Sequence, residues 1–261
     1  MKVALTRLHK LSLHATDGEI GSAIDTYFDD EGWALRYLVV ATGPLIFGRR
    51  VLLSPASITK IDPDHRQIWV DLTVEQIKGS PDIDTRKPVS RQEEERFLTY
   101  YDLMPYWSGP DIWASSAYAR GLPRLGTPPE EAEPTPDGEE KAAISDREDR
   151  ERDRESSHLR SANEIRGYKV TATDADWGHL EDLFVEEDTW RLRYALIDTG
   201  GLLSGKQTLI PCDRVNSISW TERQVLVSAT KEELDSAPDF DPRSALSPEV
   251  EDVVERHFAP R

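Results

Sequence analysis

The sequence repeats itself at a constant offset of 157 residues. Residues 20–84 align with residues 177–241 without a gap, and 20 of these 65 positions hold the same amino acid, where unrelated sequences would share roughly four. A repeat of this length indicates two whole domains of common descent rather than a solenoid of short units. The identical pairs include Asp25 with Asp182, Trp33 with Trp190, Arg36 with Arg193, and Tyr37 with Tyr194.

Each copy has the pattern of a small set of β-strands. Segments such as WALRYLVVA and RQIWVDL are rich in β-branched and aromatic residues or alternate between apolar and polar ones, which is typical of strands. Five or six short strands in a flat sheet would leave two unpaired edges, so closure into a barrel is expected. Thr73 with Gln76, and Thr230 with Glu233, each spell a capping box for a short helix at the end of a copy.

The chain between the two copies has a different character. Residues 85–120 are rich in aromatic residues, and Ser90 followed by Glu93 is the spelling of a helix N-cap. We therefore expect a helix from about Arg91 to Tyr101. Prolines and acids dominate the stretch that follows, and such a composition favours disorder.

A second helix is expected at the C-terminal end. Ser247 followed by Pro248 is a favoured helix start, and the valines that follow recur at helical spacing, which makes one apolar stripe. This helix either docks on a barrel or serves dimerisation or partner binding. The predicted fold is mainly β, with two small barrels, each with a modest core, short helices, an interdomain helix and a C-terminal helix. The predicted organisation is a barrel at 1–84, a helix with an aromatic extension at 85–120, an acidic linker at 121–157, a second barrel at 158–245, and a C-terminal amphipathic helix at 246–261.

Composition narrows the classes of partner. The formal net charge of −17 repels nucleic-acid phosphates and anionic lipid headgroups, so direct binding to either is not expected. No apolar run approaches the roughly 20 residues that cross a bilayer, so membrane insertion is not expected. The lone cysteine, Cys212, allows no intrachain disulfide and fits a reducing compartment. The sequence therefore predicts a cytoplasmic protein.

The sequence offers little catalytic chemistry. The six histidines are scattered, without the spacing of a zinc site, and no nucleophile, phosphate-loop or dinucleotide motif occurs. The repeated acids Asp25 and Asp182 allow a catalytic or metal interpretation, but one acid at the same place in each barrel is better explained by a hydrogen bond to a turn amide. We expect no enzyme activity, no cofactor and no metal.

Seven residues are candidates for contact with a partner. The repeated tryptophans and arginines could form a repeated binding face, although the tryptophans could instead cover the barrels while the arginines pack or pair with carboxylates. The aromatics of the extension lie outside the barrel pattern, and they could either recognise a partner or pack between the copies. The candidates are Trp33, Trp190, Arg36, Arg193, Tyr106, Trp107 and Trp113.

The order of these motifs resembles a known family. TDGEIGSAIDTYFDDEGWALRYLVVATG in the first copy and GYKVTATDADWGHLEDLFVEEDTWRLRYALIDTG in the second are similar to the PRC-barrel, a domain of the photosynthetic reaction-centre H subunit, of a ribosome maturation factor and of bacterial stress-related proteins. The resemblance implies two tandem β-barrels acting as an adaptor. It also implies pairing of barrels, either within the chain or in a homodimer.

We expect a non-enzymatic scaffold or adaptor that binds another protein, in stress-related physiology. Two alternatives stay open. By analogy with the ribosome maturation factor, the chain could bind RNA or take part in ribosome assembly. A cleft between the barrels could instead sense a small molecule.

Overall fold

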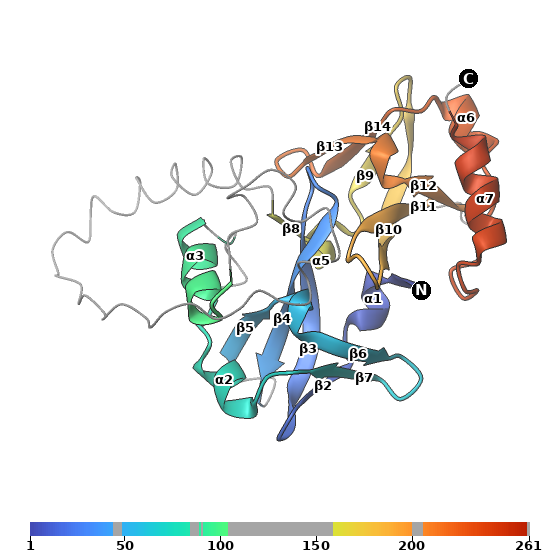
Figure 1. The fold of residues 1–261 in the computed structure, drawn as a ribbon. Helices are drawn as coiled ribbons and strands as arrows, with labels where there is room; N and C mark the ends of the chain where they lie inside the picture. The colour runs from blue at the N-terminus through green and yellow to red at the C-terminus, as the bar shows by residue number, and fades with distance from the viewer. Residues whose placement is uncertain (44–48, 84–88, 90, 104–158, 200–205, 260–261) are drawn as a thin grey trace, which may run out of the picture.

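Two seven-stranded sheets are the main structural elements of the described part of the chain (Figure 1). The structure is a computed structural model that describes residues 1–43, 49–83, 89, 91–103, 159–199 and 206–259. It is mainly β, with two small barrel-like sheets and a few short helices, so the predicted fold class is confirmed. No helix in these ranges has the length and apolar character needed to cross a membrane.

The first sheet has the strand order β5-β4-β3-β2-β7-β6. Neighbouring strands are antiparallel, except that β2 and β7 run parallel. The strands are β2 (Ser12–Ala15), β3 (Gly18–Asp29), β4 (Ala34–Thr42), β5 (Arg49–Leu53), β6 (Ile58–Asp62) and β7 (Gln67–Val70). The helices of this half are α1 (Leu5–Leu8), the 3-10 helix η1 (Pro55–Ser57), α2 (Val74–Gly79) and α3 (Arg91–Tyr100).

The second sheet repeats the first in the order β12-β11-β10-β9-β14-β13. Its strands are β9 (Lys169–Thr171), β10 (Asp176–Glu186), β11 (Leu192–Asp198), β12 (Gln207–Pro211), β13 (Val215–Ser219) and β14 (Gln224–Val227). Its helices are α5 (Ala162–Ile165), η2 (Cys212–Arg214), α6 (Lys231–Asp235) and α7 (Pro248–His257). Helices α3 and α7 lie 157 positions apart, so the structural repeat continues through a helix that the sequence alignment left out.

The two sheets exchange their first strands. Strand β1 (Lys2–Ala4) pairs with β10 of the second sheet, and β8 (Leu159–Ser161) pairs with β3 of the first. We call residues 2–8 the first arm and residues 159–165 the second arm, because each crosses from its own half of the chain to the other. In Figure 1, α3 and α7 lie on opposite sides of the molecule, and the β6–β7 and β13–β14 hairpins lie at opposite ends, as expected for two halves related by a pseudo-twofold axis.

The main hydrophobic core is shared between the halves. One continuous cluster runs from Val3 in the first arm through both sheets to Phe258 after α7. The expectation of a separate core for each copy is therefore wrong, because the exchanged arms carry apolar side chains of one half into the other. Leu5 and Leu8 of α1, for example, are fully buried and belong to this shared cluster.

Strand β4 shows how the sequence pattern places α3. Every residue of β4 is buried, which explains its unbroken apolar run, since a strand covered on both faces does not need polar residues. Leu38 and Val40 belong to the shared core, whereas Tyr37 and Val39 belong to a second cluster with Phe97 of α3. Helix α3 therefore covers the outer face of the first sheet, and Tyr37 and Phe97 meet there edge to face at 5.0 Å.

The predicted helix starts are largely present. Thr73 forms a complete capping box with Gln76, and the Thr230 side chain accepts a hydrogen bond from the Glu233 amide. At Ser247 the hydroxyl oxygen accepts from the Val250 amide. The proposed N-cap Ser90 lies outside the described residues, and so does the predicted linker at 121–157.

Candidate functional site: the seam between the halves

Two equivalent turns meet on the pseudo-twofold axis. The Leu35 amide donates to the Trp190 carbonyl at 2.8 Å, and the Leu192 amide donates to the Trp33 carbonyl at 2.7 Å. Ala34 and Arg191, which also lie 157 positions apart, pair as an antiparallel bridge. The axis therefore passes between these two residues. We call this region, together with the two arms, the seam.

Both tryptophans at the seam have left-handed backbones. The φ angle is 48° at Trp33 and 57° at Trp190, a region that costs about 1–2 kcal/mol for a residue with a Cβ. Each carbonyl that this conformation presents receives an amide of the other half. The cross-seam hydrogen bonds help to offset this strain.

Asp25 and Asp182 hold the arms. The Asp25 carboxylate accepts from the Ser161 hydroxyl at 2.6 Å and from the Asn163 amide at 3.2 Å. Asp182 accepts from both the hydroxyl and the amide of Thr6. Burial raises the pKa of both carboxyl groups, and the hydrogen bonds from the arms oppose that shift. These acids do bind backbone amides, as one of the two interpretations expects: each accepts the amide of the residue that follows it and also an amide of the opposite half.

Ion pairs with little exposure also cross the seam. Lys2 of the first arm lies 2.6 Å from Glu251 of α7 and 3.6 Å from Glu186 of β10. Arg160 of the second arm lies 2.7 Å from Asp30, just after β3. The two pairings are not equivalent, because the position matching Lys2 is Leu159 and the position matching Arg160 is Val3. The seam is thus symmetric in its backbone and asymmetric in its charges.

A small recess lies where α1 and α5 approach β10. His9 and Arg166, which are equivalent positions, both line it together with Asp182. Its volume is about 10 Å³, which is roughly the room needed by one water molecule. Burial, with the nearby Arg166 and Lys10 charges, lowers the pKa of His9 to about 4. At neutral pH the imidazole is therefore neutral and does not repel the guanidinium.

Four of the seven predicted partner-contact residues lie in the described part of the chain. Arg36 is only 6% exposed and forms a 2.6 Å ion pair with Asp29. Arg193 is more exposed and lies 3.8 Å from Glu255 of α7. Both tryptophans are half-buried against the shared core, and the Trp33 ring stacks on Phe28 with centroids 5.9 Å apart. Tyr106, Trp107 and Trp113 lie outside the described residues.

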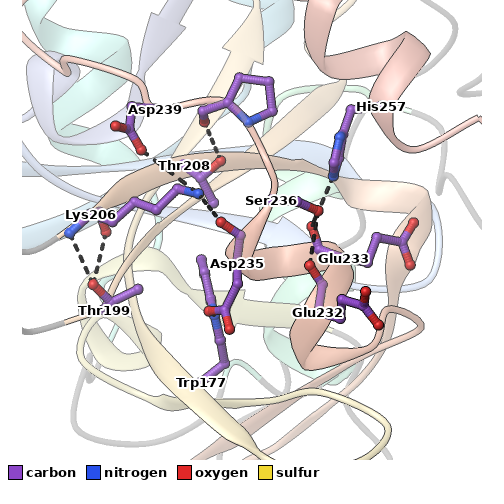
Figure 2. A network of polar contacts seen from close by, with 11 residues as sticks. Trp177, Thr199, Lys206, Thr208, Glu232, Glu233, Asp235, Ser236, Asp239 and His257 are labelled. Carbon is purple, nitrogen blue, oxygen red and sulfur yellow. Dashed lines mark hydrogen bonds and ion pairs between the residues drawn. The ribbon is translucent and has the colours of Figure 1, made fainter.

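A polar network fixes the end of the second half (Figure 2). Lys206 donates to the Asp235 carbonyl at 2.5 Å, and His257 donates to the Glu233 carbonyl at 2.8 Å. Both bonds end on α6, and both have equivalents in the first half. Arg49 donates to the Lys78 carbonyl at 2.7 Å, and Tyr100 donates to the Gln76 carbonyl at 2.8 Å. These contacts dock α6 and α7, just as the equivalent contacts dock α2 and α3.

Within the described ranges no group of three potential metal ligands occurs.

An aromatic stack that the sequence analysis missed lies on an outer face. Trp69 of β7 is 39% exposed, and its ring stacks on His14 of β2 with centroids 4.6 Å apart. Lys60 of β6 is paired with Trp69 on the other side. The signal was present in the alternation of β7, since Ile68 and Val70 point inward and the residue between them must point outward. The equivalent positions in the second half hold Thr171 and Leu226.

The second half is similar to a known family. Residues 158–234 match the PRC-barrel domain, so this part of the resemblance is confirmed. The matched segment runs from the residue before β8 into α6 and therefore includes the second arm, whose strand pairs with β3 of the first sheet. No curated protein matches the chain.

Proposed function

We propose that residues 1–103 are a second, more diverged copy of the PRC-barrel domain. Three observations support this proposal: the 157-residue offset, the one-to-one correspondence of strands and helices, and the equivalent hydrogen bonds on α2 and α6. Asp17 and Asp174 add a further pair, since each carboxylate accepts an amide at the start of the short helix at 2.7 Å.

We further propose that the protein is a non-enzymatic scaffold whose paired barrels bind another protein. The observation that carries this proposal is the stack of Trp69 on His14. A tryptophan held flat on an outward strand, with Lys60 beside it, offers an apolar surface with a polar rim, which is the arrangement of a protein-binding hot spot. The expected partner covers Trp69 with an apolar side chain. The described contacts of the repeated aspartates and arginines are structural ones. They therefore support the non-enzymatic part of the proposal.

The two alternative functions have less support. The net charge of −17 disfavours direct contact with RNA phosphates. The recess at the seam has the volume of about one water molecule, far below the several hundred Å³ of a typical ligand pocket. The scaffold function is therefore better supported than either alternative.

Site-specific cross-linking in cells tests the scaffold function. A photoreactive phenylalanine analogue replaces Trp69 in one version of the chain and Leu226, the equivalent exposed position, in the matched control. We expect a discrete protein adduct from position 69 that is lost when His14→Ala is added, because that change removes the support of the ring. If neither position gives a discrete protein adduct, or if ribonuclease removes the adduct, the scaffold proposal is wrong.

A further inference from the structure

Each half of the chain has an arm and a face that receives the arm of the other half. We propose that these arms and faces form a recognition pair that holds the halves together without a covalent connection. This proposal does not depend on the scaffold function, since it concerns the partner that each half recognises.

The contacts of the first arm are extensive for its length. Its strand pairs in register with Phe184 to Glu186 of β10. Its helix buries Leu5 and Leu8 in the shared core, and the carboxylate of Asp182 receives the first turn of that helix. Strand pairing supplies direction, the leucines supply apolar burial, and the carboxylate fixes register.

The second arm makes the corresponding contacts on the first half. Its strand pairs with Tyr27 to Asp29 of β3. Leu159 and Ile165 are buried, and Asp25 receives the Ser161 hydroxyl. Neither set of contacts involves residues 104–158, so a cut in that stretch removes none of the contacts described here.

A cut chain tests the recognition without the covalent link. A protease site is introduced between residues 121 and 157, the folded full-length protein is cleaved, and the products are examined at about 1 µM by size-exclusion chromatography and native mass spectrometry. We expect one species that contains both fragments in a 1:1 ratio, with the elution volume of the uncut protein. Separation of the fragments on dilution, whether they stay folded or unfold, would overturn the proposal.

Discussion

Asp25 and Asp182 lie 157 positions apart in the sequence, and each accepts hydrogen bonds from the arm of the opposite half. Asp25 receives the second arm through Ser161 and Asn163, and Asp182 receives the first arm through Thr6. Each acid also accepts the amide of the residue that follows it, at 2.8 Å. A buried carboxylate needs several donors to compensate for lost hydration, and here the donors come from both halves. The acids therefore link the two halves through hydrogen bonds.

Removal of the Thr6 hydroxyl should weaken the seam. Thr6→Val keeps the shape of the side chain but leaves the buried Asp182 carboxylate without one donor, so we expect a loss of about 1–3 kcal/mol in the free energy of unfolding. Denaturant unfolding followed by circular dichroism measures it. Thr59→Val is the control, because its hydroxyl bonds to a carbonyl at an exposed site, and it should change stability by less than about 0.5 kcal/mol. Equal effects of the two changes would contradict the role of Asp182.

His9 should make stability fall on acidification. Its pKa is about 4 in the folded protein and near 6.5 in the unfolded chain, so the unfolded state binds more protons between these values. Stability is therefore fully present above about pH 6.5 and decreases as the pH falls towards 4, by about 3 kcal/mol in total. His9→Gln should flatten this part of the curve of unfolding free energy against pH. An unchanged slope in the variant would refute the assignment to His9.

Asp25 and Asp182 should act with the opposite sign. Burial raises their pKa values in the folded state, so the folded protein binds more protons than the unfolded chain at pH values above about 3.9. Their contribution is fully present below that pH and is lost as the pH rises through the raised pKa values. We expect the difference in unfolding free energy between wild type and the Asp25→Asn/Asp182→Asn variant to change between about pH 3.9 and the raised pKa values. At higher pH this difference should be constant. Paired denaturation curves at several pH values measure this difference. A difference that does not depend on pH would contradict the raised pKa values of the two acids.

The shared core should make the halves unfold together. Leu5 is fully buried, and its helix contacts β10 of the other half, so Leu5→Ala should cost about 2–5 kcal/mol. Hydrogen exchange should show an equal loss of protection in β4 and β11. The exposed Leu226→Ala is the control and should change protection little. Loss of protection in β11 alone would mean that the halves unfold independently.

Gly21 should not accept a side chain. A Cβ at this position would lie 1.9 Å from the backbone oxygen of Ala41, so the paired strands β3 and β4 would have to separate. Gly21→Ala should lower stability by about 3 kcal/mol or more. Gly18→Ala is the matched control, since its Cβ would meet Val74 at an ordinary 3.7 Å. The thermal midpoints of the two variants measure the contrast, and similar midpoints would contradict it.

The sequence by itself determined the duplication, the strand pattern and the starts of the short helices, because these depend on local periodicity and on residues a few positions apart. The alternation of apolar and polar positions in β7 also indicates that Trp69 points outward. The similarity of α3 and α7 was hidden, because a docked helix needs only apolar positions such as Phe97 and Val254 at the same spacing and not the same amino acids.

Only the tertiary structure decided which sheet each arm joins. Strands β3 and β10 have equivalent edges, and each has an acid at the same position. No local sequence pattern therefore distinguishes an arm that pairs within its own half from one that pairs across the seam. The choice depends on contacts between residues 130 or more positions apart, such as Arg160 with Asp30 and Thr6 with Asp182. These contacts exist only once both sheets are folded, and they join the two halves of the chain.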